Sequence, residues 1–112
     1  MDKVLKLAAL AVLLPLAAQS QVANGLYEEG GCRVPQSSAV VRVSPGYLSF
    51  FESACALSNA RGVANRPGAV AYDAICDGEG QRFTTTYTLQ AAGPNLILSN
   101  DGYTFTYYYC GP

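Results

Sequence analysis

Turn-forming residue pairs divide most of this chain into short segments, and their spacing constrains the fold more than any other feature. Pro-Gly, Asp-Gly and Gly-Pro pairs occupy positions 45–46, 77–78, 93–94 and 101–102. Such pairs supply the backbone dihedral angles that tight hairpin turns need. Between several of them, residues alternate with the period of two that is typical of strands. The chain is therefore expected to be all-β.

The strand-like segments number about eight. Since exposed strand edges invite aggregation, that many short antiparallel strands have to close into a barrel or stack as two sheets. We expect a small antiparallel meander that closes into a barrel, with a two-sheet sandwich as the alternative. The expected strands are residues 25–29, 38–43, 47–53, 54–59, 70–76, 82–91, 95–99 and 103–110.

The first 20 residues have the pattern of a secretory signal peptide. Lys3 and Lys6 precede an apolar run from Leu7 to Ala18, and small residues lie at the expected cleavage site, which ends at Ser20. The run is shorter than the roughly 20 apolar residues that a membrane span requires. We therefore expect residues 1–20 to be removed, leaving a single domain at residues 21–112 that is periplasmic or secreted and has no membrane span.

Four cysteines, Cys32, Cys55, Cys76 and Cys110, form an even set in a chain expected to be exported. They predict two disulfides. A zinc site is disfavoured, because its ligands occur in close pairs and the chain has no histidine. Cys55 and Cys76 flank one connection between successive strands, so we expect them to pair. Cys32 ends the first strand and Cys110 the last, so their bond would fasten the two strands that meet when the barrel closes.

Cleavage would leave a chain without histidine, lysine, methionine or tryptophan. Serine–histidine and cysteine–histidine pairs, serine–lysine dyads and lysine Schiff bases are then excluded. With five arginines and seven acidic residues, the chain lacks the basic surface that sequence-independent nucleic-acid binding requires. We expect a non-enzymatic protein without cofactor or metal, and a monomer.

Two short motifs carry a resemblance that extends over residues 25–110. They are Glu52-Ser53-x-Cys55 and Cys76-x-Gly78-Glu79-Gly80, followed by an aromatic strand that ends at Cys110. With them, the chain resembles a group of small exported four-cysteine proteins of alphaproteobacteria that has no established activity. It departs from that group at Tyr109, often an arginine there, and in lacking tryptophan. The resemblance implies an exported disulfide scaffold and supplies no catalytic residue.

Glu52 and Glu79 are candidate site residues because each lies three positions from a cysteine of the expected Cys55–Cys76 bond. That bond would allow the two carboxylates to face one site, as a glycosidase pair or a set of cation ligands requires. The alternative is that Glu79 is a solvated turn residue and that Glu52 hydrogen-bonds to an arginine or to turn backbone.

Arg61 and Arg66 are candidate partner contacts in the connection at residues 61–68, which the Cys55–Cys76 bond would close. In the last strand, Tyr103, Phe105, Tyr107 and Tyr109 share a face that we expect in the core, leaving Tyr108 exposed for recognition. These features favour a binding or inhibitor module with an unknown protein or small-molecule partner. A small-ligand carrier with a barrel cavity and a carboxylate-dependent hydrolase are the alternatives.

Overall fold

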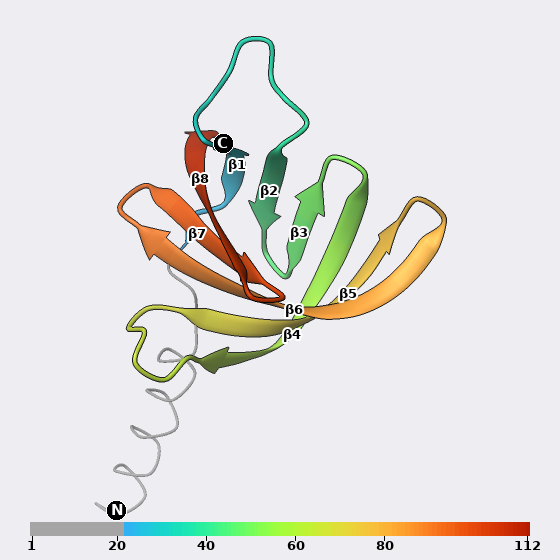
Figure 1. The fold of residues 1–112 in the computed structure, drawn as a ribbon, viewed down its shortest axis with the longest axis vertical. Coiled ribbons are helices and arrows are strands. Elements are labelled where there is room, and N and C mark those ends of the chain that lie inside the picture. Colours follow the sequence, from blue (N-terminus) through green and yellow to red (C-terminus); the bar gives the residue numbers. More distant parts are fainter. Residues whose placement is uncertain (1–21) are drawn as a thin grey trace, which may run out of the picture.

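The protein is a closed β-barrel in a computed structural model that describes residues 22–112, so the predicted signal peptide lies outside the described residues. Each strand pairs antiparallel with the next, and β8 pairs with β1 (Figure 1). The predicted eight-stranded meander is confirmed, and the sandwich alternative is wrong. No helix within residues 22–112 is long and apolar enough to cross a membrane. The strands are β1 (Gly25–Glu29), β2 (Val40–Ser44), β3 (Tyr47–Phe50), β4 (Ser53–Gly62), β5 (Val70–Gly78), β6 (Gln81–Ala92), β7 (Asn95–Asn100) and β8 (Tyr103–Gly111).

Two-residue turns join β2 to β3, β6 to β7 and β7 to β8 at the predicted pairs, whereas Asp77-Gly78 ends β5 and the turn to β6 follows two residues later. Glu79 and Gly80, between β5 and β6, have φ angles of 52° and 77°, and Asp101 and Gly102, between β7 and β8, have 50° and 80°. Consecutive positive φ angles fit the turns whose twist matches that of the flanking strands. The short turns therefore fix the register of these hairpins.

The barrel interior is filled by alternate residues of the strands. Cys55 and Cys76 lie opposite each other on β4 and β5, with their Cα atoms 4.0 Å apart, and their disulfide is fully buried. The second disulfide joins Cys32 to Cys110, as predicted, with 5.7 Å between Cα atoms. Both predicted pairings are confirmed. The buried cluster comprises Tyr27, Val41, Val43, Leu48, Cys55, Ala74, Cys76, Leu89, Leu96 and Leu98.

Strand β4 is longer than the sequence predicted and continues to Gly62. Its pairing with β5 shifts register between Ser58 and Arg61, where Asn59 has a φ of 55°. Asparagine tolerates this left-handed conformation, and a bulge lets a strand continue after its alternation breaks. The assignment of Arg61 to a loop is therefore wrong, because Arg61 pairs with Ala71 within the sheet.

The aromatic face of β8 is only partly in the core, so the expectation that all of it is buried is wrong. Tyr107 packs against the buried cluster, but Phe105 and Tyr103 are 43% and 69% exposed. These two residues pair with the end of β7, away from the Tyr107 end that packs on the core. Tyr108, on the other face, is 41% exposed, as predicted.

Candidate functional site

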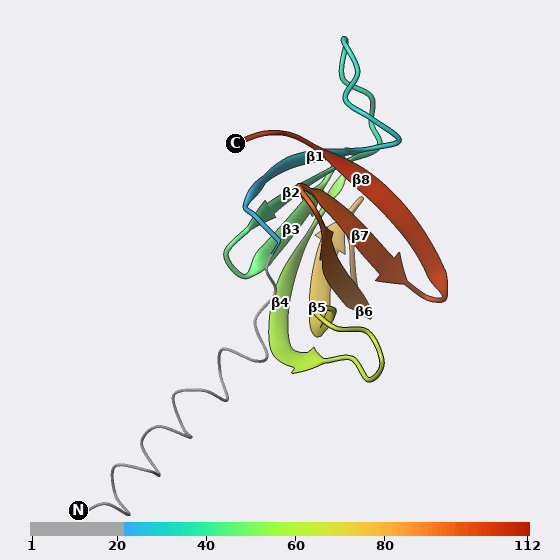
Figure 2. The same cartoon turned by 90° about the vertical axis from the view of Figure 1, so that its left-hand side faces the viewer.

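The connection between β1 and β2, residues 30–39, projects away from the barrel (Figure 2). We call it the β1–β2 loop. Val34 lies near its tip with a side chain that is fully exposed, and Pro35 and Gln36 beside it are exposed as well. Because no neighbour covers it, the side chain of Val34 removes no apolar surface from water on folding and adds no hydrophobic stabilisation to the fold.

The base of the β1–β2 loop is built on a buried carboxylate. Glu28 in β1 is 2% exposed, and it is the one buried charged residue among residues 22–112. Its carboxylate accepts hydrogen bonds from the backbone N–H of Ser37 at 2.8 Å and of Arg33 at 2.9 Å. Hydrogen bonds from Ser37 and from the Arg33 backbone lower the pKa of Glu28 to about 2. A charge buried among backbone donors fixes both arms of the loop to β1.

Three further contacts tie the same base to the barrel. The Cys32–Cys110 disulfide joins the loop to β8. The backbone N–H of Glu29 donates to the carbonyl of Ala39 at 2.9 Å, closing the loop at its root. The guanidinium of Arg33 donates to the carbonyl of Glu29 at 2.9 Å and lies 3.4 Å from the Glu28 carboxylate. The loop is therefore rigid at its base and free at its tip.

Tyr108, a predicted binding residue, lies beside this base. It is the cross-strand partner of Glu28 in the β1–β8 pair, so both side chains are on the outer face of the barrel. Side chains of directly opposed residues are close enough to touch. The structure thus places an exposed aromatic ring next to the β1–β2 loop.

Arg61 lies in β4 and Arg66 in the β4–β5 connection, and both have intramolecular partners. Arg61 forms an ion pair with Asp73 at 3.0 Å, and Arg66 donates to the side-chain carbonyl of Gln90 at 2.9 Å. Asn59 and Arg61 together lower the pKa of Asp73. Arg66 therefore holds the connection against β6, and Arg61 ties β4 to β5.

Glu52 and Glu79 converge, as the disulfide pairing suggested. A Cβ atom at Gly78 would lie 2.5 Å from Cβ of Ser53 and 2.8 Å from the carbonyl oxygen of Glu52, so only glycine permits this close approach of two turns. A hydrogen bond and electrostatic repulsion from Glu79 raise the pKa of Glu52. Both residues are exposed.

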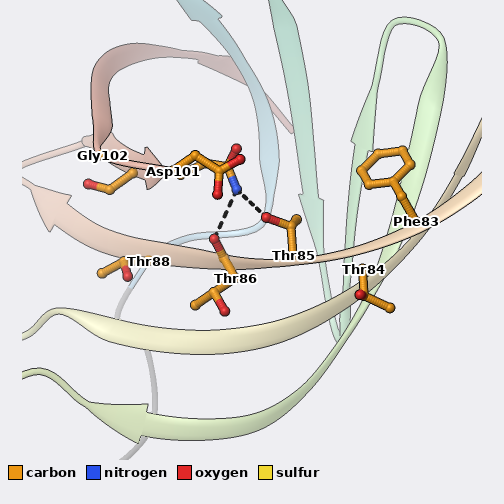
Figure 3. A pocket seen from close by; sticks show the side chains of 9 residues that line it. Phe83, Thr84, Thr85, Thr86, Thr88, Asp101 and Gly102 are labelled. Carbon is orange, nitrogen blue, oxygen red and sulfur yellow. Dashed lines mark hydrogen bonds between the residues drawn. The ribbon is translucent and has the colours of Figure 1, made fainter.

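Two of the hollows that flank the barrel wall differ in their lining. One, of about 490 Å³, lies between β6 and the β7–β8 turn and is lined by threonines, Asn100 and Asp101 (Figure 3). The other, of about 570 Å³, opens beside the β2–β3 turn, and Val43, Leu57, Tyr72 and Leu89 contribute to its largely apolar lining. Among residues 22–112, no three histidine, cysteine, aspartate or glutamate side chains gather as a metal site would require.

The sequence reasoning missed the β1–β2 loop as a site. The gap between the first two expected strands is as long as the 61–68 connection, and it contains a cysteine and a proline after Gly30-Gly31. These residues were a usable signal for an ordered, projecting loop. The role of Glu28 had no local signal, because its donors come from five and nine residues further along the chain.

Comparison of the chain with protein-family models, with curated proteins and with solved structures found no match. The resemblance to small exported proteins of alphaproteobacteria therefore stays a prediction.

Proposed function

We propose that this protein is a non-enzymatic binding module that inserts the tip of the β1–β2 loop into an apolar depression of a partner protein. One observation carries the proposal. A buried carboxylate and a disulfide fix the base of a loop whose apolar tip has no contact in its own barrel. Burying a carboxylate is costly unless it is well hydrogen-bonded, and here the result of that burial is an ordered projection.

Order in the free loop favours tight binding. A loop that already has its bound conformation loses little entropy on docking. Covering Val34 fully would contribute about 2 kcal/mol, which corresponds to roughly thirtyfold in affinity. Tyr108 beside the base would extend the contact with an aromatic ring of the kind enriched at interfaces. If the depression is the active site of an enzyme, the module acts as an inhibitor by occluding it.

The two disulfides indicate an oxidising compartment. We propose that the chain reaches the periplasm or the extracellular medium after removal of its signal peptide, and that it acts there as a monomer. No catalytic role is proposed for Glu52 and Glu79, since both are exposed.

A second candidate is a carrier of a small apolar ligand. The apolar hollow near the β2–β3 turn favours it, because about 570 Å³ is within the range of small-molecule sites. In this case the hollow, and not the β1–β2 loop, is the site. Extraction of the purified protein with organic solvent, followed by mass spectrometry, would reveal the ligand.

The proposal is tested by capturing partners from periplasmic and secreted extracts on the oxidised protein and measuring their affinity. Val34→Ser should weaken binding at least about tenfold. Ile75→Ser is the matched control, because it also removes an exposed branched aliphatic side chain, 49% exposed on β5. Equal affinities of the native protein and Val34→Ser would refute the proposal.

A further inference from the structure

Strand β6 runs on beyond the end of its neighbour β7. Residues Thr88 to Ala92 pair with β7, whereas the pairing of β6 with β5 extends from Gln81 to Leu89. Over residues 82–87, β6 therefore has a strand on one side only within the described chain. The cause is the β7–β8 turn, because Asp101 and Gly102 redirect the chain into β8 while β6 continues toward the β5–β6 turn (Figure 1).

The backbone of Thr84 points toward this open side. Cys55 and Cys76 are 4.0 Å apart at Cα, the short distance of a non-hydrogen-bonded pair, so the polar groups of Cys76 point at β6. The backbone N–H and C=O of Phe83, opposite Cys76, then hydrogen-bond with β5. Those of Thr84, the next residue, point away from β5 and toward the open side. A hydrogen bond supports this orientation. The carbonyl of Thr86, two residues along the strand, points to the open side and accepts a hydrogen bond from the Asn100 side chain at 3.0 Å.

The hollow of about 490 Å³ lies along this edge. It is lined by the consecutive residues Phe83, Thr84, Thr85 and Thr86. Figure 3 shows Phe83 and Thr85 on one side of β6 and Thr84 and Thr86 on the other. Because successive side chains of a strand point to opposite faces, a hollow that contacts all four runs beside the backbone and not over one face. Its opposite wall is residues 99–102.

We propose that this edge binds an extended segment of a partner polypeptide, which adds a strand to β6 and sets a lysine or arginine beside Asp101. Open edges normally carry lysine, proline or a covering loop that prevents such pairing. Within the open stretch 82–87, the one charge is Arg82, which is ion-paired with Asp77, and residues 83–87 contain neither a charge nor a proline. Asp101 forms none of the ion pairs found among residues 22–112, so the end of the groove is acidic and fits a basic residue. This site is separate from the β1–β2 loop and does not depend on it.

Selection from a library of random linear peptides on the oxidised protein tests the proposal. Selected peptides should show alternating β-branched residues and a lysine or arginine at one fixed position. Each peptide is also made in two N-methylated forms, one methylated at its odd-numbered and one at its even-numbered backbone nitrogens. One form should lose binding and the other keep it, because only every second residue directs its N–H toward β6. Amide shifts in the protein should map to residues 82–86 and 100–102.

Two substitutions at one position provide the matched variants. Thr84→Pro removes the edge N–H without touching the β5 pairing and should weaken peptide binding about tenfold or more. Thr84→Val keeps the N–H and the branched shape and should bind within about twofold of the native protein. The N-methylated peptides give the same information without any change to the protein, should Thr84→Pro misfold.

Four results would overturn the proposal. Three of them are a selection that yields no peptide, peptides that bind Thr84→Pro as tightly as the native protein, and peptides that bind equally whichever set of alternate nitrogens is methylated. Protection of the Thr84 amide that rises with protein concentration, without peptide, would assign the edge to a second copy of the chain and would also overturn it.

Discussion

The β1–β2 loop is held at its base alone, whereas the β4–β5 connection at residues 63–69 is held at its root and also at its tip. The first has a buried carboxylate and a disulfide where it leaves the barrel, and Val34 is free. In the second, Arg66 and Pro67 at the tip hydrogen-bond with Gln90 of β6. Two connections of similar length thus differ in what they leave to a partner. The position of the anchor, and not the length of the loop, decides which one presents side chains.

Removing the anchor of the β1–β2 loop should have the largest effect. Cys32→Ser with Cys110→Ser opens a link between residues 78 apart and should lower the free energy of unfolding by about 4 kcal/mol. It should also accelerate amide exchange throughout the loop. Chemical denaturation and hydrogen exchange measure the two effects.

The control is Cys55→Ala with Cys76→Ala. This link spans 21 residues, so its loss should cost at least about 3 kcal/mol, with no change in the relative exchange of the β1–β2 loop. If both double variants loosen the loop equally, the loop owes its order to the stability of the barrel and not to its own anchor, and the contrast between the two connections fails.

The second-largest effect is expected from acid, which should release the β1–β2 loop from its base. The pKa of Glu28 is about 2 in the folded protein and near 4.5 when unfolded, so its stabilising effect is complete above pH 4.5 and is lost as the pH falls toward 2. The backbone amide resonances of Arg33 and Ser37 should therefore shift across this range. Glu28→Gln should remove this titration and leave the loop mobile at neutral pH.

The contribution of Glu52 to stability should change with pH in the opposite direction to that of Glu28. The pKa of Glu52 is raised by Glu79, so protonation favours the folded state as the pH falls through the folded pKa. Signals of the β3–β4 turn should thus titrate above pH 4.5, before those of the β1–β2 loop. A single shared transition would show that global unfolding, and not Glu28, controls the loop.

The sequence predicted the fold well because its evidence is local. Alternation and turn pairs identified eight strands, and the ends of the first and last strands gave the Cys32–Cys110 pairing. Strand β4 was cut short because the bulge at Asn59 interrupts the alternation. The exposure of Phe105 and the open edge of β6 depend on the relative lengths of neighbouring strands, which turn pairs fix only approximately.

The smallest effect is expected from the arginines that the sequence singled out. Arg61→Ala with Arg66→Ala should change partner affinity by less than about twofold, because both guanidinium groups already have intramolecular partners. The Arg61–Asp73 pair is about half exposed on each side, so its loss should cost at most about 1 kcal/mol of stability. Titration calorimetry with the captured partner and denaturation measure the two quantities.

A loss of more than about tenfold in affinity, with the barrel intact, would move the binding site from the β1–β2 loop to the β4–β5 connection, since only a group buried in the interface has that effect. Combined with Val34→Ser, the double variant also tests independence, because residues on separate sites should give additive changes in binding free energy.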